Sequence, residues 1–209
     1  MSNFFFNTLW PGLTVWCVLY ISDYALTITC ARLYRAGVSE KLALEGSYEI
    51  TPYFQRDIDS LRLVSPRFLA MLVWGAVMLT GFWLLARHSW SGLYNFGLGS
   101  MVLVQLAIHV RHLRNLVLFR AIINTDGVRG RIEYSRPLML RMSACELLTF
   151  SGLFFLLFVF TQHWFMLGGA TACLSTALKH RRLTRRLASS TTSRELETEH
   201  VLSREKNSF

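Results

Sequence analysis

The chain has 209 residues, a formal net charge of +9 at neutral pH and 52% hydrophobic residues. The hydrophobic residues come in long blocks, whereas the helices of a water-soluble domain carry narrow apolar stripes, so the composition argues against an ordinary soluble fold. The length fits one structural unit. Most of the basic residues fall on one side of the predicted membrane spans, as is usual for membrane proteins, and this accounts for the positive charge. We therefore expect no nucleic-acid partner.

Five apolar blocks predict membrane-spanning helices, each of which needs about 20 apolar residues to cross a hydrocarbon core roughly 30 Å thick. The predicted spans cover residues 9–33, 68–86, 93–110, 144–160 and 164–179. The last two spans come from one stretch, residues 145–178, which is too long for one ordinary span. Its polar interruption at residues 161–164 predicts a tight turn with Trp164 at the headgroup level. We therefore expect an all-α membrane bundle, with a first span followed by two helical hairpins.

The distribution of basic residues favours five spans over four. With five spans, 21 of the 22 Lys and Arg residues fall on one side, and only Arg87 falls on the other. Such a bias marks the cytoplasmic side. We therefore expect the N-terminus outside, the C-terminus in the cytoplasm, and a multi-pass location in the cell membrane, either a plasma or an inner membrane.

Residues 1–187 are expected to form a single membrane domain with cytoplasmic loops over 34–67 and 111–143. In the first loop, residues 39–45 predict a short helix, and Thr51-Pro52 predicts the start of another, because Pro is favoured at the first helical position. In the second loop, apolar and charged residues alternate over 128–134, which predicts a strand within a β-hairpin. Residues 188–209 are polar and rich in Ser, Thr and Glu, a composition typical of a disordered tail.

Polar and aromatic side chains share one side of the first predicted span. At 100° per residue this side carries Trp16, Tyr20, Asp23, Thr27, Cys30 and Tyr34. Asp23 falls near the middle of the bilayer, where a carboxylate is costly unless it is paired, solvated or protonated. It is either an ion or proton site or a structural hydrogen-bond partner of another helix, for which Gln105 and Asn95 are candidates.

The third span is the most polar of the long helices, and Gln105, His109 and His112 share one of its faces. One interpretation is that this face lines a polar pathway with Asp23 at its deep end, in which the histidines sense or carry protons because histidine titrates near neutral pH. No further ligands accompany the two histidines, and we expect neither a metal nor a cofactor.

The alternative interpretation places the basic residues of this region at the inner membrane surface, where they contact lipid headgroups or a protein partner. The residues assigned to such contacts are Arg111, His112, Arg114, Arg181 and Arg182. Anionic lipid on the cytoplasmic side attracts basic side chains that flank a span.

These features favour a small channel or carrier for an ion, a proton or a small polar solute, whose path passes Asp23, Asn95, Gln105 and His109. Five spans leave little protein to enclose a pore, so we expect a homo-oligomer, most simply a symmetric dimer. The alternative function is a non-catalytic scaffold or regulatory protein that binds anionic lipid or a partner through its basic face. An enzyme is the least supported function, because the sequence contains no catalytic motif that we can identify.

Overall fold

The computed structural model describes residues 8–49, 51–88, 90, 92–125 and 129–206, with side chains described up to residue 187. Most of this part of the chain is helical, in agreement with the predicted all-α fold. Its long helices are α2 (Leu9–Leu33), α5 (Pro66–His88), α6 (Gly92–Asn124), α7 (Arg136–Thr161) and α8 (Trp164–Lys206).

Four helices in the described part of the chain are long and apolar enough to cross a membrane: α2 with its continuation to Lys41, α5, α6 and α7. Helix α8 is not among them, because its apolar part, residues 164–178, leads directly into the basic segment 179–186. The structure thus supports an integral membrane protein. The fifth span and the orientation of the chain remain predictions.

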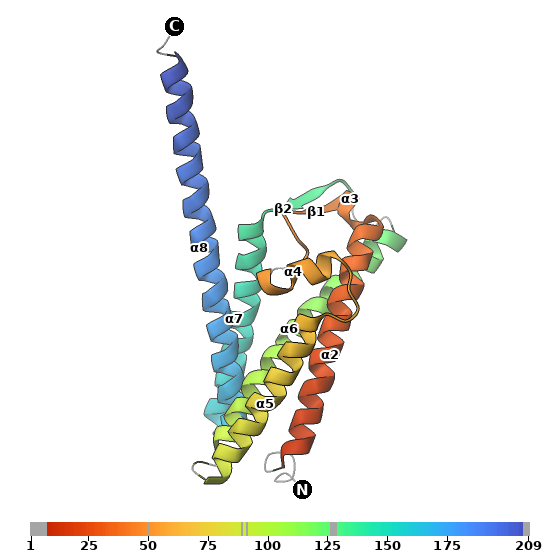
Figure 1. Cartoon of the computed structure of the whole chain (residues 1–209), viewed down its shortest axis with the longest axis vertical. Helices are drawn as coiled ribbons and strands as arrows, with labels where there is room; N and C mark the ends of the chain where they lie inside the picture. The colour runs from red at the N-terminus through yellow and green to blue at the C-terminus, as the bar shows by residue number, and fades with distance from the viewer. Residues whose placement is uncertain (1–7, 50, 89, 91, 126–128, 207–209) are drawn as a thin grey trace.

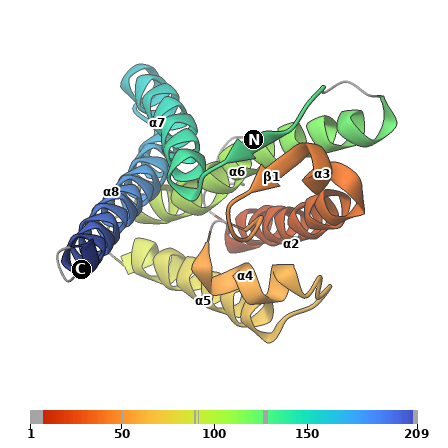
Figure 2. The same ribbon diagram turned by 90° about the horizontal axis from the view of Figure 1, so that it is seen from above.

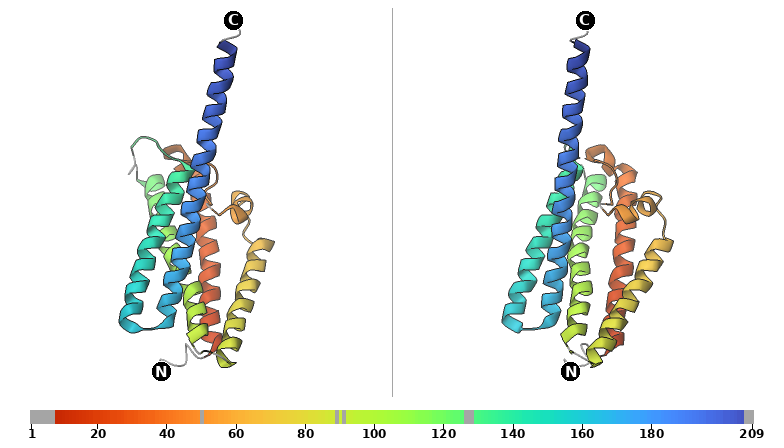
Figure 3. Two further views of the ribbon diagram at one scale, coloured as in Figure 1. Left: turned by 90° about the vertical axis from the view of Figure 1, so that its left-hand side faces the viewer. Right: turned by 60° about the vertical axis from the view of Figure 1, so that its left-hand side comes forward.

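The long helices run side by side along the long axis of the molecule (Figure 1). The start of α2, the end of α5, the start of α6 and the α7–α8 turn lie together at one end, and the C-terminal part of α8 projects beyond the other end (Figures 1 and 3). Helix α6 packs against α2, α5 and α8, while α7 packs mainly against α8. The view from above accordingly places α6 in the middle of the molecule (Figure 2).

Helices α6 and α8 touch through their backbones. A methyl group added at Gly99 of α6 would collide with the carbonyl group of Phe165, and one added at Gly168 of α8 would collide with that of Phe96. The Ser100 hydroxyl donates a bifurcated hydrogen bond to the carbonyl oxygens of Phe96, at 2.8 Å, and of Gly168, at 3.0 Å. Small residues permit such an approach between membrane helices, where lipid provides no hydrophobic drive for association.

A two-stranded parallel sheet joins the two predicted cytoplasmic loops. After α2, the chain forms a π-helical segment η1 (Tyr34–Val38), a short α3 (Ser39–Lys41) and strand β1 (Leu42–Leu44). Strand β1 pairs with β2 (Ile132–Tyr134), Leu42 opposite Ile132 and Leu44 opposite Tyr134. The backbone N–H of Glu45 extends this contact by donating to the carbonyl oxygen of Tyr134 at 3.0 Å.

Two local predictions in these loops are wrong in part. The predicted helix over 39–45 ends at Lys41, because Leu42 turns into an apolar cluster with Cys30, Val38 and Phe119, and this burial outweighs local helix propensity. The predicted strand over 128–134 exists at Ile132–Tyr134, but its partner is β1 rather than a neighbouring strand of a hairpin. Residue 128 lies outside the described residues.

Helix α4 (Pro52–Asp59) begins at the predicted proline and lies crosswise to the long helices (Figures 1 and 3). Ile58 anchors it in a buried cluster with Ile28 and Ala31 of α2. The buried carboxylate of Asp57 lies 3.6 Å from the guanidinium of Arg67 and 3.9 Å from that of Arg62. These ion pairs attach α4 to the start of α5.

Helix α8 continues to Lys206, whereas the sequence predicts a disordered tail from residue 188 onward. Residues 194–206 include Leu, Glu, Arg and Lys, which have high helix propensity, and the preceding helix removes the cost of nucleation. Residues 207–209 of the predicted tail lie outside the described residues.

Replacing Gly168 by alanine should destabilise the protein by about 1–3 kcal/mol, because the added methyl group forces two backbones apart. Gly152→Ala on α7 is the matched control, since its methyl group meets no atom within 4 Å and alanine is the better helix former. Thermal unfolding of both variants in the same detergent measures the difference. Equal melting temperatures would contradict the backbone contact between α6 and α8.

Candidate functional site

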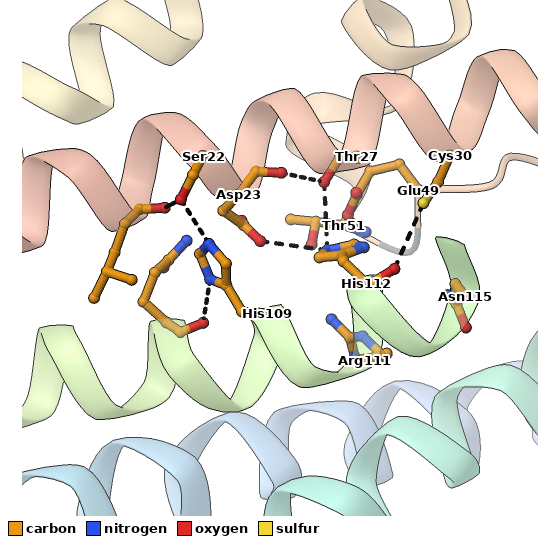
Figure 4. Close-up of polar contacts among 12 residues, drawn as sticks. Ser22, Asp23, Thr27, Cys30, Glu49, Thr51, His109, Arg111, His112 and Asn115 are labelled. Carbon is orange, nitrogen blue, oxygen red and sulfur yellow. Dashed lines mark hydrogen bonds and ion pairs between the residues drawn. The ribbon is translucent and has the colours of Figure 1, made fainter. Parts of the chain in front are cut away.

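The polar face of α2 meets the polar face of α6 partway along both helices (Figure 4). Asp23 and Thr27 lie one turn apart on α2, and His109 and His112 lie one turn apart on α6, so each pair projects from one face of its helix. The Cys30 thiol adds a third contact one turn further along α2, donating to the carbonyl oxygen of His112 at 3.6 Å. The two faces that the sequence predicts separately therefore form one interface.

The hydrogen bonds of His112 define its tautomer. The Thr27 hydroxyl donates to the backbone carbonyl of Asp23 at 2.9 Å, so it acts as an acceptor toward Nε2 of His112, 3.3 Å away. Nε2 thus carries the proton, and it also lies 3.5 Å from Oδ1 of Asp23. Nδ1 is left as the acceptor for the hydroxyl of Tyr48, at 3.5 Å. We assign His112, whose exposed fraction is 6%, as a neutral imidazole whose Nε2–H donates to Thr27 and lies beside Oδ1 of Asp23 without a hydrogen bond to it.

Tyr48 extends this chain of hydrogen bonds beyond the two helices. Its hydroxyl accepts from the side-chain amide of Asn115 at 3.3 Å and donates to His112. Burial raises the pKa of Tyr48, so the hydroxyl keeps its proton at neutral pH. The donors therefore run in one direction, from Asn115 through Tyr48 and His112 to Thr27, which donates to the backbone carbonyl of Asp23.

His109 is placed so that both of its protonation states are hydrogen bonded. Its Nδ1 lies 2.8 Å from the carbonyl oxygen of Gln105 and must donate to it. Its Nε2 lies 2.7 Å from the Ser22 hydroxyl, which is also 3.0 Å from the carbonyl oxygen of Leu19. When His109 is neutral, Ser22 donates to Nε2. When His109 is protonated, Nε2 donates to Ser22, whose hydroxyl turns to Leu19.

Asp23 lies between the two histidines and has an unfilled acceptor position. Its side chain is 20% exposed, and Oδ1 makes no hydrogen bond with the described residues. Its electrostatic neighbours are His109, Glu49, Arg111 and the amide of Gln105. A largely buried carboxylate with a free lone pair is a binding position for a proton or a cation, because either would remove the cost of the isolated charge.

A cavity of about 320 Å³ adjoins the cluster where α6 and α7 separate. Tyr48, His112 and Asn115 line it, so the hydrogen-bond chain that ends beside the Asp23 carboxylate begins at the cavity wall. Strand β1 and Tyr134 of β2 cover it. Its remaining lining includes the guanidinium of Arg111, which donates to the Ser143 hydroxyl of α7.

The structure brings together most of the residues predicted for a polar path. Gln105 and His109 of α6 adjoin Asp23 of α2, whereas Asn95 lies ten residues before Gln105, about 15 Å along α6. The Oδ1 atom of Asn95 is buried without a hydrogen bond to the described residues. Asn95 is therefore not part of this cluster, and the suggested pairing of Asp23 with Asn95 is wrong.

The residues assigned to headgroup or partner contacts divide into three environments. His112 is buried against α2, which corrects its expected place at the membrane surface. Arg111 is half-buried beside Ser143, and the exposed Arg114 forms an ion pair with Glu146 of α7. Arg181 and Arg182 are exposed on α8. No group of three potential metal ligands occurs within the described ranges.

Sequence reasoning missed Tyr48, Glu49, Ser22 and Asn115. Tyr48 and Glu49 lie in an irregular part of the first loop, which has no periodic pattern to indicate which side chains are buried. Glu49 is held there by its own loop, accepting from the backbone N–H of Thr51 at 2.7 Å. Ser22 and Asn115 each lie next to a predicted polar face of their helix. A prediction that assigned a wider angular range of the helix to that face would have included them.

Tyr48→Phe should lower the free energy of unfolding by about 1–2 kcal/mol, because Nδ1 of His112 and the amide of Asn115 lose a buried partner. Tyr53→Phe is the matched control: Tyr53 is 48% exposed, and its ring contacts with Phe54 and Arg67 survive the change. Chemical unfolding in detergent compares the two. A Tyr48 variant as stable as the Tyr53 variant would contradict the assigned hydrogen-bond chain.

Comparison with known proteins gives no match: no family model fits the sequence, and no curated protein or solved structure is significantly similar. The contacts among α2, α6 and residues 34–67 are therefore the basis for a function.

Proposed function

We propose that the protein is a small membrane carrier in which Asp23 binds a proton, or an ion or polar solute that exchanges with a proton. The observation that carries this proposal is the directed hydrogen-bond chain from the cavity through Tyr48 and His112 to Thr27, beside which Oδ1 of Asp23 lies unpartnered, 3.5 Å from Nε2 of His112. His109 supports it from the other side of the carboxylate, because its partners accommodate both protonation states. Buried histidine and carboxylate groups in this arrangement are typical of proton relays.

In the proposed carrier, a proton reaches Asp23 from the cavity end, through His112, because His112 lines the cavity and Asp23 does not. Toward the other end of the bundle, Trp16, Leu79, Tyr94 and Leu98 form a buried apolar cluster between α2, α5 and α6. We propose that this apolar cluster closes the path on that side and that transport requires it to loosen.

We further propose five spans, with the N-terminus outside and the C-terminus in the cytoplasm. The antiparallel packing of α7 and α8 and the return of α8 alongside α6 support a fifth crossing by residues 164–178. The basic residues then lie with the cavity on the cytoplasmic side of the cell membrane. Because five helices enclose little space, a homo-oligomer is part of the proposal.

The scaffold function is kept as a second candidate because of the basic surface of α8. Lys179, Arg181, Arg182 and Arg185 are exposed on this helix. A run of cations at the end of a membrane helix is attracted to anionic lipid headgroups or to an acidic partner. This function needs no exchangeable proton at Asp23.

Asp23→Asn should abolish proton movement, because an amide cannot take up and release a proton at this position. Proteoliposomes containing a pH-sensitive dye and subjected to a pH gradient measure the flux, and the variant should fall to the rate of protein-free liposomes. Asp59→Asn is the matched control, since Asp59 is exposed on α4. If wild-type protein moves no proton and Asp23→Asn lowers only the melting temperature, the scaffold function is favoured.

A tag fused after residue 209 should be protected in intact cells, and a tag before residue 1 should be accessible from outside. Five spans place the two ends of the chain on opposite sides of the membrane, whereas four place them on the same side. Antibody labelling before and after permeabilisation distinguishes the two. Accessibility of both tags in intact cells would rule out the fifth span.

A further inference from the structure

The cavity between α6 and α7 carries two charged groups that the hydrogen-bond chain does not use, Arg111 and Glu49. Arg111 makes its side-chain hydrogen bond to the neutral hydroxyl of Ser143, and Glu49 makes its own to a backbone N–H. Among the described residues neither forms an ion pair, whereas the other charged pair in the lining, Arg114 and Glu146, neutralises itself. The cavity wall therefore offers one cation and one anion that form no ion pair with the described residues, although both act electrostatically on Asp23.

The rest of the lining is apolar and adaptable. Leu42 and Leu44 come from β1, Leu118 from α6, and Met139 and Met142 from α7. Methionine side chains are flexible and polarizable, and they fit apolar ligands of different shapes. A volume of about 320 Å³ is at the lower end of the range for ligand pockets, so the cavity suits a headgroup with a short length of chain rather than a whole lipid.

The position of the cavity matches such a ligand. Arg111 follows directly on the third predicted span, so the charged groups lie near headgroup depth. Helices α6 and α7 make few contacts with each other, since α7 packs mainly against α8. A guanidinium binds a phosphate or carboxylate through several parallel N–H donors, of which Arg111 uses one on Ser143.

We infer that this cavity binds a zwitterionic amphiphile, with its phosphate or carboxylate on Arg111, its ammonium group on Glu49, and its adjoining chain along Met139 and Met142. The inference goes beyond the proposed proton carrier, because binding of this ligand requires no proton transfer at Asp23. The zwitterion is supplied either by a lipid headgroup or by a free solute, and both sources share the same recognition chemistry.

The test measures equilibrium binding to full-length protein in detergent, without a pH gradient, by native mass spectrometry and thermal shift. The probes are phosphatidylethanolamine, phosphatidic acid and free phosphoethanolamine. Phosphatidylethanolamine should bind better than phosphatidic acid, which lacks the ammonium group. Saturable binding of free phosphoethanolamine would assign the site to a solute, and binding of the lipid alone would assign it to a headgroup. Binding of neither would overturn the inference.

Substitutions of Arg111 and Glu49 test which residue binds which end of the ligand. Arg111→Gln should weaken binding of both lipids about tenfold or more, whereas Glu49→Gln should weaken phosphatidylethanolamine by a similar factor and spare phosphatidic acid. Arg120→Gln on α6 and Glu133→Gln on β2 are matched controls, because both residues are exposed and outside the cavity lining. The Arg111→Lys variant keeps the positive charge, so it should bind both lipids better than the Arg111→Gln variant does. That difference would show that the weaker lipid binding of Arg111→Gln is not caused by misfolding.

Asp23→Asn separates this inference from the proposed function. The variant should bind phosphatidylethanolamine as wild type does, even though its proton flux is lost. If the Arg111 and Glu49 variants bind all probes as well as their controls do, the cavity is not a zwitterion site, whatever the result for proton flux.

Discussion

A carboxylate placed partway along an apolar helix must find compensation inside the protein, and Asp23 finds it on α6. Lipid offers no hydrogen bonds, so the polar face of α2 can be buried only against another polar face. Gln105, His109 and His112 provide that face. The position of α6 at the centre of the bundle, in contact with α2, α5 and α8, follows from this requirement together with the small residues on its opposite side.

Compensation of Asp23 is incomplete among the described residues. Its Oδ1 atom makes no hydrogen bond with them, although Nε2 of His112 lies 3.5 Å away and the groups around the carboxylate are hydrogen bonded to one another. An unsatisfied buried acceptor is costly. In the proposed carrier, a bound proton or cation removes that cost.

The sequence predicted the long helices and both polar faces, because hydropathy and helical spacing are local properties. It could not predict that residues 42–44 pair with residues 132–134, since a parallel pair between such distant segments depends on how the helices between them pack. Tyr48 and Glu49 were missed for the same reason: their loop is irregular, and only the tertiary fold carries it to His112. The sequence predicted His112 at the membrane surface because the residues next to it are basic. In the structure its side chain is buried, since it lies on the face of α6 that packs against α2.

The backbone contact at Gly99 and Gly168 constrains how the molecule changes shape. Two helices whose peptide groups touch cannot approach further, and the bond from Ser100 to Gly168 resists their separation. They remain free to tilt about that point. Any rearrangement of the bundle would therefore keep α6 and α8 in contact at this crossing, with the two helices tilting about it.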